Sequence, residues 1–205
     1  LGDVSITEPT RISAVVLRAK QAQKSWSALS LEERQQKVVQ AYECLTVVEE
    51  QLAILISKEM GKDYRRATYE VAGTVQNAAY FTKEIAQALK TETMGRNGEM
   101  QYRPLGVVAV ISPWNYPLAM ANNLLLPALI AGNSVVLKPS EETPLVAELF
   151  VKTLNQMLPE NILQIAHGDA ETGKALVNAE VNMVAFTGSL AAGKHIMASA
   201  ASGLK

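Results

Sequence analysis

Two clusters of polar residues follow strand-like apolar runs, and their side chains have the chemistry to bind or stabilise a ligand. Asn115, preceded by Trp114, comes shortly after the β-branched run 107–111, and a side-chain amide can donate a hydrogen bond to developing negative charge. Lys138 and Glu141 follow a second such run, and they can donate to and accept from ligand hydroxyl groups. Because ligands of open α/β sheets bind outside the carboxyl ends of the strands, both clusters predict a ligand site.

A third candidate, the segment from Phe186 to Ser189, has the composition of a phosphate site. Gly188 would let a ligand approach the backbone closely, and Ser189 offers a hydroxyl at the expected start of a helix, whose first N–H groups are free. The G-x-G-x-x-G pattern of dinucleotide-binding turns is absent after Ile111. A strand–Gly–Ser–helix turn can also have a purely structural cause, so this segment gains weight only beside the other two clusters.

Each polar residue has a plainer interpretation when it is taken alone. Trp114 would then be a core aromatic, Asn115 a turn-former, and Lys138 with Glu141 a solvated pair on a loop. The coincidence of both clusters with the ends of neighbouring strands favours the functional interpretation.

The elements that position these residues read as repeated βα units. The run 107–111 predicts a strand buried on both faces, Pro113 and Pro117 end it and start a helix over 118–131, and 134–137 is the next strand. We expect this βαβ crossover to be right-handed. Further strands over 161–166 and 181–186 and helices over 144–157, 171–179 and 191–202 complete an α/β fold, a Rossmann-like doubly wound parallel sheet.

Long helices precede the sheet. Apolar spacing predicts three helices. The first covers 10–28, the second begins at a capping box of Ser30 and Glu33 and runs through Met60, and the third covers 64–89. Gly61 is the stop signal between the second and the third. Cys44 lies within the second helix, and we interpret it as a buried structural cysteine because nothing near it would lower the pKa of a thiol.

Composition excludes several classes of protein. The 205 residues carry a net charge of -1, which indicates no nucleic-acid partner, and no apolar run reaches membrane-spanning length. One cysteine excludes an internal disulfide and fits the reducing cytoplasm, and neither His167 nor His195 belongs to a group with metal-ligand spacing, so we expect no metal. Leu1 is not an initiator Met, and residues 198–205 resemble a helix and its exit, so we expect a piece of a longer protein.

Three ordered motifs carry a family resemblance. The segments PWNYP, PALIAGNSVVLKPSEETPL and FTGS resemble the NAD(P)-dependent aldehyde dehydrogenase superfamily, including its semialdehyde dehydrogenases. EMGK at residues 59–62 and the later Glu70 also resemble that family, and Asp63 departs from a common proline. The resemblance runs from about Trp26 to the end of the chain. It implies that residues 1–205 are an incomplete N-terminal cofactor-binding domain, without the catalytic domain that carries the family's cysteine and glutamate.

The resemblance also implies roles for particular residues. Asn115 would be the catalytic residue, as the side-chain donor of an oxyanion hole. The expected cofactor-binding residues are Trp114, Lys138, Ser140, Glu141, Thr187, Gly188 and Ser189. A ribose-binding Glu141 would repel a 2′-phosphate, so we expect NAD rather than NADP, although Ser140 leaves room for NADP.

The implied reaction is oxidation of an aldehyde or semialdehyde to the acid, through a cysteine thiohemiacetal and a thioester formed in the missing half. A CoA-acylating enzyme is the alternative within the family. A non-catalytic nucleotide-binding or interaction module is the alternative if the natural chain ends here. Residues 93–104, with a turn at 95–98, resemble a hairpin that the family uses for subunit contacts, and an exposed strand edge invites pairing, so we expect a homodimer or homotetramer.

Overall fold

Four parallel strands form the sheet that carries the candidate residues. In the computed structural model, which describes residues 1–205, the order across the sheet is β5-β4-β3-β6. The strands are β3 (Val107–Ile111), β4 (Ser134–Lys138), β5 (Leu163–Ile165) and β6 (Met183–Phe186). The predicted Rossmann-like doubly wound parallel sheet is therefore confirmed, with β3 in a central position between β4 and β6.

The strands are buried on both faces because successive side chains point to opposite sides. Val108 and Val110 belong to the larger hydrophobic cluster, whereas Val107 and Ala109 belong to a smaller cluster on the other face. An amphipathic strand would not fit between two apolar layers, which explains why the run 107–111 is continuously apolar.

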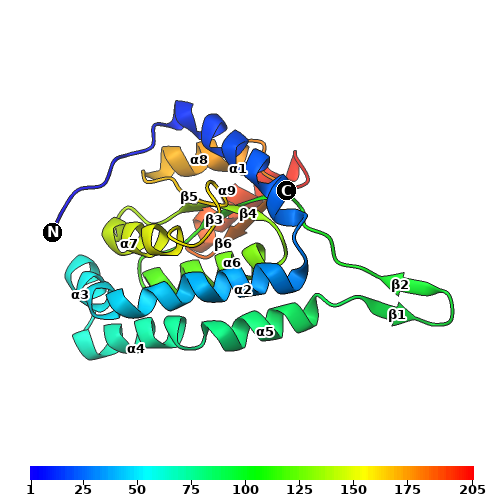
Figure 1. The fold of residues 1–205 in the computed structure, drawn as a ribbon. Coiled ribbons are helices and arrows are strands. Elements are labelled where there is room, and N and C mark those ends of the chain that lie inside the picture. Colours follow the sequence, from blue (N-terminus) through cyan, green and yellow to red (C-terminus); the bar gives the residue numbers. More distant parts are fainter.

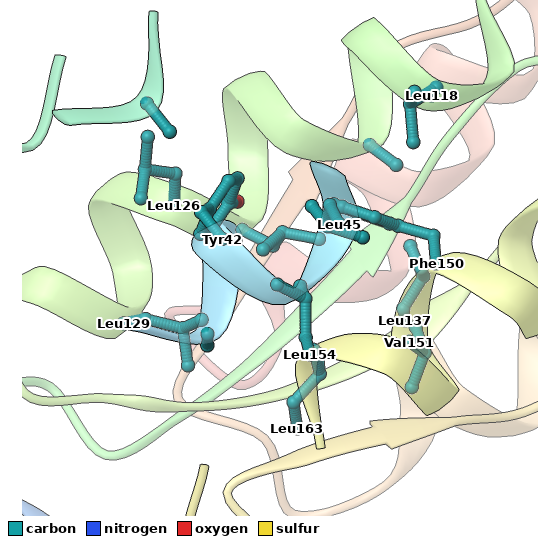
Figure 2. Packing of buried hydrophobic residues seen from close by; sticks show 14 of the residues in the cluster. Tyr42, Leu45, Leu118, Leu126, Leu129, Leu137, Phe150, Val151, Leu154 and Leu163 are labelled. Carbon is teal, nitrogen blue, oxygen red and sulfur yellow. The ribbon is translucent and has the colours of Figure 1, made fainter. Parts of the chain in front are cut away.

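Two layers of helices cover the face that belongs to the larger cluster. Helices α6 (Pro117–Ile130) and α7 (Pro144–Leu154) pack on the sheet. Behind them lie α2 (Leu31–Glu43), α3 (Glu49–Met60), α4 (Tyr64–Val75) and α5 (Ala78–Ala88), so that most residues of α6 are buried (Figure 1). Figure 2 shows Tyr42 and Leu45 inserted between α6 and α7, with Leu137 of the sheet close to Phe150 and Val151.

The opposite face is covered by the beginning of the chain and by later helices. A short 3-10 turn, η1 (Pro9–Arg11), leads into α1 (Ile12–Ser27), which packs on β3, β4 and β5. Helix α8 (Ala170–Asn178) lies beside α1, and α9 (Leu190–Ala201) lies against α8 (Figure 1). At the end of α1 the buried Trp26 donates from Nε1 to Leu129 O over 2.9 Å, which ties α1 to the end of α6.

The connections change face at one point in the sheet. The path β3–α6–β4–α7–β5 moves outward with its helices on one face, whereas α8 returns the chain on the other face to β6, beside β3. The strand order therefore reverses between β3 and β6, and this switch point is where open α/β sheets place their ligands.

The predicted helical layer is broken in two places. The expected helix from Ser30 to Met60 is interrupted by the 3-10 segment η2 (Cys44–Val48), where three β-branched residues disfavour the α-helix. The expected helix 64–89 is two helices that separate at Gln76 and Asn77. Cys44 is half-buried at the first break rather than fully buried as predicted, because the change of helix type turns it partly outward.

The ends of the later elements also differ from prediction by a few residues. The third strand of the sheet begins at Leu163 rather than at Asn161, because Asn161 adopts a left-handed φ of 64° and belongs to a turn. The fourth begins at Met183, and the preceding Asn182 donates from its backbone to Val107 O. Gly61 ends α3 as predicted, with a φ of 71° and a hydrogen bond to Ser57 O.

A two-stranded hairpin stands away from the rest of the molecule. Strands β1 (Glu92–Met94) and β2 (Gly98–Met100) pair antiparallel, and Gly95 with a φ of 67° forms their turn (Figure 1). The side chains on both strands are largely exposed. None of the helices in the chain combines the length and the apolar character that a membrane crossing requires.

Candidate functional site

The three predicted clusters meet at one edge of the sheet. In the register of the strands, Ile111 is paired with Lys138 on one side and with Phe186 on the other. The loop with Trp114 and Asn115 therefore leaves the sheet between the Lys138 loop and the Phe186 turn. Segments that are more than 20 residues apart in sequence are neighbours at this edge, as the positions of the strands predicted.

The loop after β3 leaves the Asn115 side chain unengaged. Ser112 N donates to Lys138 O over 3.2 Å, which continues the sheet by one residue before Pro113 ends it. Trp114 is 51% exposed, so it is not the core aromatic that its residue type alone suggested. Asn115 is also exposed, and its side-chain amide makes no hydrogen bond within the chain, so the amide is available to a ligand.

Lys138 and Glu141 form an ion pair at the end of β4. Lys138 Nζ lies 3.0 Å from Glu141 Oε2; the lysine side chain is 6% exposed and the glutamate side chain 53%. Partial burial acts to raise the pKa of the Glu141 carboxyl, but hydrogen bonds from its own backbone N–H and from Lys138 outweigh this effect and lower the pKa. The pair therefore presents a fixed cation and an accessible anion side by side.

A cavity of about 510 Å³ opens between α8 and α9, beside this ion pair. Its volume lies in the usual range for a small-molecule site, which is about 300 to 1,000 Å³. Apolar and polar side chains both line it, namely Ile111, Val177, Phe186, Ile196, Lys138, Asp169, Asn178 and His195. An apolar slot with a buried ammonium on its wall suits a heterocycle that is attached to a hydroxylated or phosphorylated sugar.

The turn after β6 combines a helix cap with close packing. Thr187 N donates to Ile111 O over 3.1 Å, and Ser189 Oγ accepts from Ala192 N over 3.2 Å as the N-cap of α9. A Cβ on Gly188 would lie 2.5 Å from Phe186 Cζ, so this glycine makes room for a ring that lines the cavity. The remaining N–H groups in the first turn of α9 are the part of this turn that suits a phosphate.

Ser140 does not line the cavity between α8 and α9. Its Oγ accepts from Glu142 N over 3.3 Å, and together with Glu141 it borders a second cavity of about 500 Å³ beside Gly168 and Asp169. Neither cavity is lined by Asn115 or by Thr187. The predicted residues thus divide into a group around the Lys138 pair and a group at the open ends of β3 and β6.

Other contacts at this edge had no predicted role. Lys62 and Glu70, from the turn after α3 and from α4, contact the Asn115 loop and the start of α6. In the sequence, only the family resemblance of the EMGK segment and of Glu70 pointed to these two residues. Their residue types and spacing alone predicted no role for them. The sequence did not predict that Val177 and Ile196 line a cavity. An apolar residue on a helix follows the same spacing whether it packs in the core or lines a pocket.

Comparison with known proteins identifies the family. The model of the aldehyde dehydrogenase family matches residues 1–205. This chain belongs to that family. Among curated relatives, it is 35% identical over 193 residues to the D-glyceraldehyde dehydrogenase (NADP(+)) of Picrophilus torridus, an alignment that covers 91% of the chain and 39% of the relative. It is 37% identical over 179 residues to the N-succinylglutamate 5-semialdehyde dehydrogenase of Legionella pneumophila, covering 85% and 36%.

Aldehyde dehydrogenases of known structure share the fold. A betaine aldehyde dehydrogenase of Staphylococcus aureus in complex with NAD+ superimposes with a TM-score of 0.93 and 29% identity, over 100% of this chain and 44% of that one. The chain thus spans well under half the length of the relatives that it matches. The resemblance drawn from PWNYP, LKPSE and FTGS is confirmed.

Proposed function

We propose that the complete protein oxidises an aldehyde or semialdehyde to the carboxylic acid with NAD(P)+. In this proposal residues 1–205 form the incomplete cofactor-binding domain and supply one catalytic residue, Asn115. The observation that carries the proposal is the unengaged amide of Asn115 at the end of β3, flanked by the Lys138 pair and the start of α9. The family and the NAD+ and NADP(+) named for its relatives support the same reaction.

Cofactor binding falls to residues on both sides of the switch point. Lys138 and Glu141 would hold ribose hydroxyls, the cavity between α8 and α9 would take the adenine, and the first turn of α9 would hold phosphate. When bound, the nicotinamide supplies the acceptor for the hydride that leaves the substrate carbon. Trp114 and Thr187 would lie along the open edge beside it, with Gly188 and Ser189 at the phosphate.

Asn115 would stabilise the oxygen of the substrate carbonyl as negative charge develops there. A side-chain amide is suited to this role because it is a neutral donor whose direction is fixed before the reaction begins. The nucleophilic thiolate and the general base of the resemblance lie outside this chain. Cys44 is not that nucleophile, since it lies in η2 among α2, α3 and α7.

The protruding hairpin β1–β2 would make subunit contacts in a homodimer or homotetramer, because its edges and its side chains are exposed.

The complete protein would work in the cytoplasm. The single cysteine, half-buried and unpaired, fits that reducing compartment.

The test is the turnover of an Asn115→Ala variant of the complete protein. Formation of NADH from NAD+ would be followed with propanal, benzaldehyde and succinic semialdehyde. We expect turnover on the best of these aldehydes to fall about 100- to 1000-fold, which is the usual loss for one oxyanion-hole donor. Affinity for NAD+ should stay unchanged, because Asn115 does not line the cavity between α8 and α9.

A matched variant, Asn77→Ala, removes the same amide at the junction of α4 and α5, far from the strand ends, and should keep full turnover. The oxyanion role would be refuted by an Asn115→Ala enzyme that loses affinity for NAD+ but turns over normally.

A further inference from the structure

The turn between α3 and α4 holds the Asn115 loop from outside the sheet. Lys62, the residue after the Gly61 stop, donates from Nζ to Asn115 O over 2.9 Å, across 53 positions of sequence. The same ammonium lies 3.8 Å from the centre of the Tyr116 ring, within the range of a cation–π contact. Lys62 therefore touches the backbone of Asn115 and the side chain of the next residue.

Glu70 joins this lysine to the start of α6. Glu70 Oε2 forms a salt bridge with Lys62 Nζ, and Glu70 Oε1 accepts from Leu118 N and Ala119 N, both over 3.1 Å. The glutamate side chain is 1% exposed and that of Lys62 is 10% exposed. A buried carboxylate with these partners has a fixed position, and it fixes both the lysine and the first turn of α6.

These contacts hold the backbone that follows the Asn115 side chain. The carbonyl of Asn115 is bound by Lys62, and the N–H groups three and four residues later are bound by Glu70. The Asn115 side chain is exposed and makes no hydrogen bond within the chain, so its direction follows from that of its backbone.

A second glutamate in the same helical hairpin provides an internal comparison. Glu59, in α3, accepts from Leu145 N over 2.7 Å and from Val146 N over 2.9 Å, and so caps α7 as Glu70 caps α6. No lysine joins Glu59 to the loop that precedes α7. Capping a helix start therefore does not require the lysine, and the contact from Lys62 to Asn115 needs another explanation.

We propose that Lys62 and Glu70 are positioning residues that aim the side-chain amide of Asn115 for the reaction. This inference rests on the proposed oxyanion role of Asn115. In this proposal the effect of the two residues on turnover passes through Asn115 alone. Their contribution therefore disappears when the Asn115 amide is removed.

The test is a double-mutant cycle in the complete protein with Glu70→Gln and Asn115→Ala. Glutamine keeps an oxygen for the two α6 N–H groups but loses the ion pair with Lys62, so the fold is retained. We expect Glu70→Gln alone to lower kcat about 10- to 100-fold, as misplacement of a reacting group by about 1 Å can, with KM for NAD+ unchanged. In the Asn115→Ala background the same change should alter kcat by less than about twofold.

Three outcomes would overturn the inference. If the two effects on kcat multiply, or if Glu70→Gln leaves kcat unchanged while Asn115→Ala lowers it, positioning is wrong and the oxyanion role stands. If Asn115→Ala leaves kcat unchanged, the oxyanion role fails and this inference fails with it.

The control Glu59→Gln weakens an equivalent helix cap without contacting the Asn115 loop, and it should leave kcat unchanged. A loss of kcat equal to that of Glu70→Gln would mean that a weakened helix cap is enough to explain the effect.

The two lysine variants test the charge on Lys62. Lys62→Arg keeps the positive charge on a side chain of different length, and it should lower kcat less than Lys62→Met does. Equal kcat values for these two lysine variants would also contradict the proposal.

Discussion

The carboxylate of Glu141 is the residue most suited to distinguish NAD from NADP. It is half-exposed beside a buried ammonium, and its lowered pKa keeps it negatively charged at neutral pH. A 2′-phosphate near this carboxylate would meet like charge, while a ribose hydroxyl would meet an acceptor. The relatives include proteins named for NADP(+) as well as one bound to NAD+, so the family alone does not decide the preference.

We therefore expect Glu141→Gln to raise the ratio of kcat/KM for NADP to that for NAD by about tenfold, equivalent to about 1.4 kcal/mol. The measurement is initial rates with both nucleotides in the complete protein. Glu142→Gln is the matched control, because it removes the neighbouring exposed carboxylate, which makes no ion pair. A ratio that does not change in the Glu141 variant would mean that this carboxylate does not contact the ribose.

For single residues, the sequence predicted which side chains lie at the strand ends better than it predicted how buried each side chain is. Asn115, Lys138 and Glu141 were found because they follow apolar runs, and the end of such a run can be recognised from neighbouring residues alone. The exposure of Trp114 and the burial of Trp26 do not follow from their immediate neighbours, which are Pro113 and Asn115 in one case and Ser25 and Ser27 in the other, because they depend on what the fold brings against each ring. The need for glycine at position 188 depends on the conformation of Phe186, which the sequence does not specify.

Among the elements, the helical hairpin α3–α4 contacts the helices that follow the Lys138 loop and the Asn115 loop. Glu59 caps the helix after the Lys138 loop, and Glu70 caps the helix after the Asn115 loop. The two carboxylates differ in their partners. Glu59 has no cation in an ion pair, and burial raises the pKa of its carboxyl despite the hydrogen bonds from Leu145 N and Val146 N and the nearby His167.

The raised pKa of Glu59 predicts a pH dependence of stability. The folded protein binds this proton more tightly than the unfolded chain, so the associated stability is fully present below the ordinary pKa of 4.5 and is lost as pH rises through the folded pKa. We expect the urea midpoint of the wild type, measured relative to that of Glu59→Gln, to fall as the pH is raised from below 4.5 through the raised pKa of folded Glu59. Parallel curves for the two proteins would contradict it, and Glu50→Gln, an exposed change in α3, provides the control.

The strands and the first and last helices were predictable because apolar runs and capping residues are local signals. The capping box at Ser30 and Glu33 is present with both of its hydrogen bonds. The breaks at Cys44–Val48 and at Gln76–Asn77 were not predicted, since the apolar spacing continues through them. At the first break the β-branched residues Thr46, Val47 and Val48 were a local signal, but the apolar spacing that runs through them outweighed it in the prediction.

On the scale of the whole molecule, the hairpin β1–β2 is the least supported part. It makes no layer with the sheet, and Met94, Tyr102 and Leu105 in and after it are about half exposed (Figure 1). A hairpin that stands away from the body and exposes Met94 and Met100 gains stability when another subunit covers it.

Shortening the hairpin should therefore reduce the assembly. We expect replacement of residues 92–100 by a short Gly-Ser linker to lower the molar mass of the complete protein in light scattering by at least half. The variant Val47→Lys changes an apolar side chain that is 85% exposed in η2, and it should leave the molar mass unchanged. A hairpin-deleted protein of undiminished molar mass would show that the subunits meet elsewhere.

The two tryptophans of the chain give it two separate optical reporters. Trp26 is 1% exposed with its indole N–H bonded to Leu129 O, so its emission should lie at short wavelength and resist quenching by iodide until α1 detaches from α6. Trp114 is 51% exposed at the open edge of the sheet, so its emission should be red-shifted and open to iodide. Shielding of the quenchable fraction by nucleotide would then report occupancy of the site, while the unquenched fraction reports the integrity of the fold.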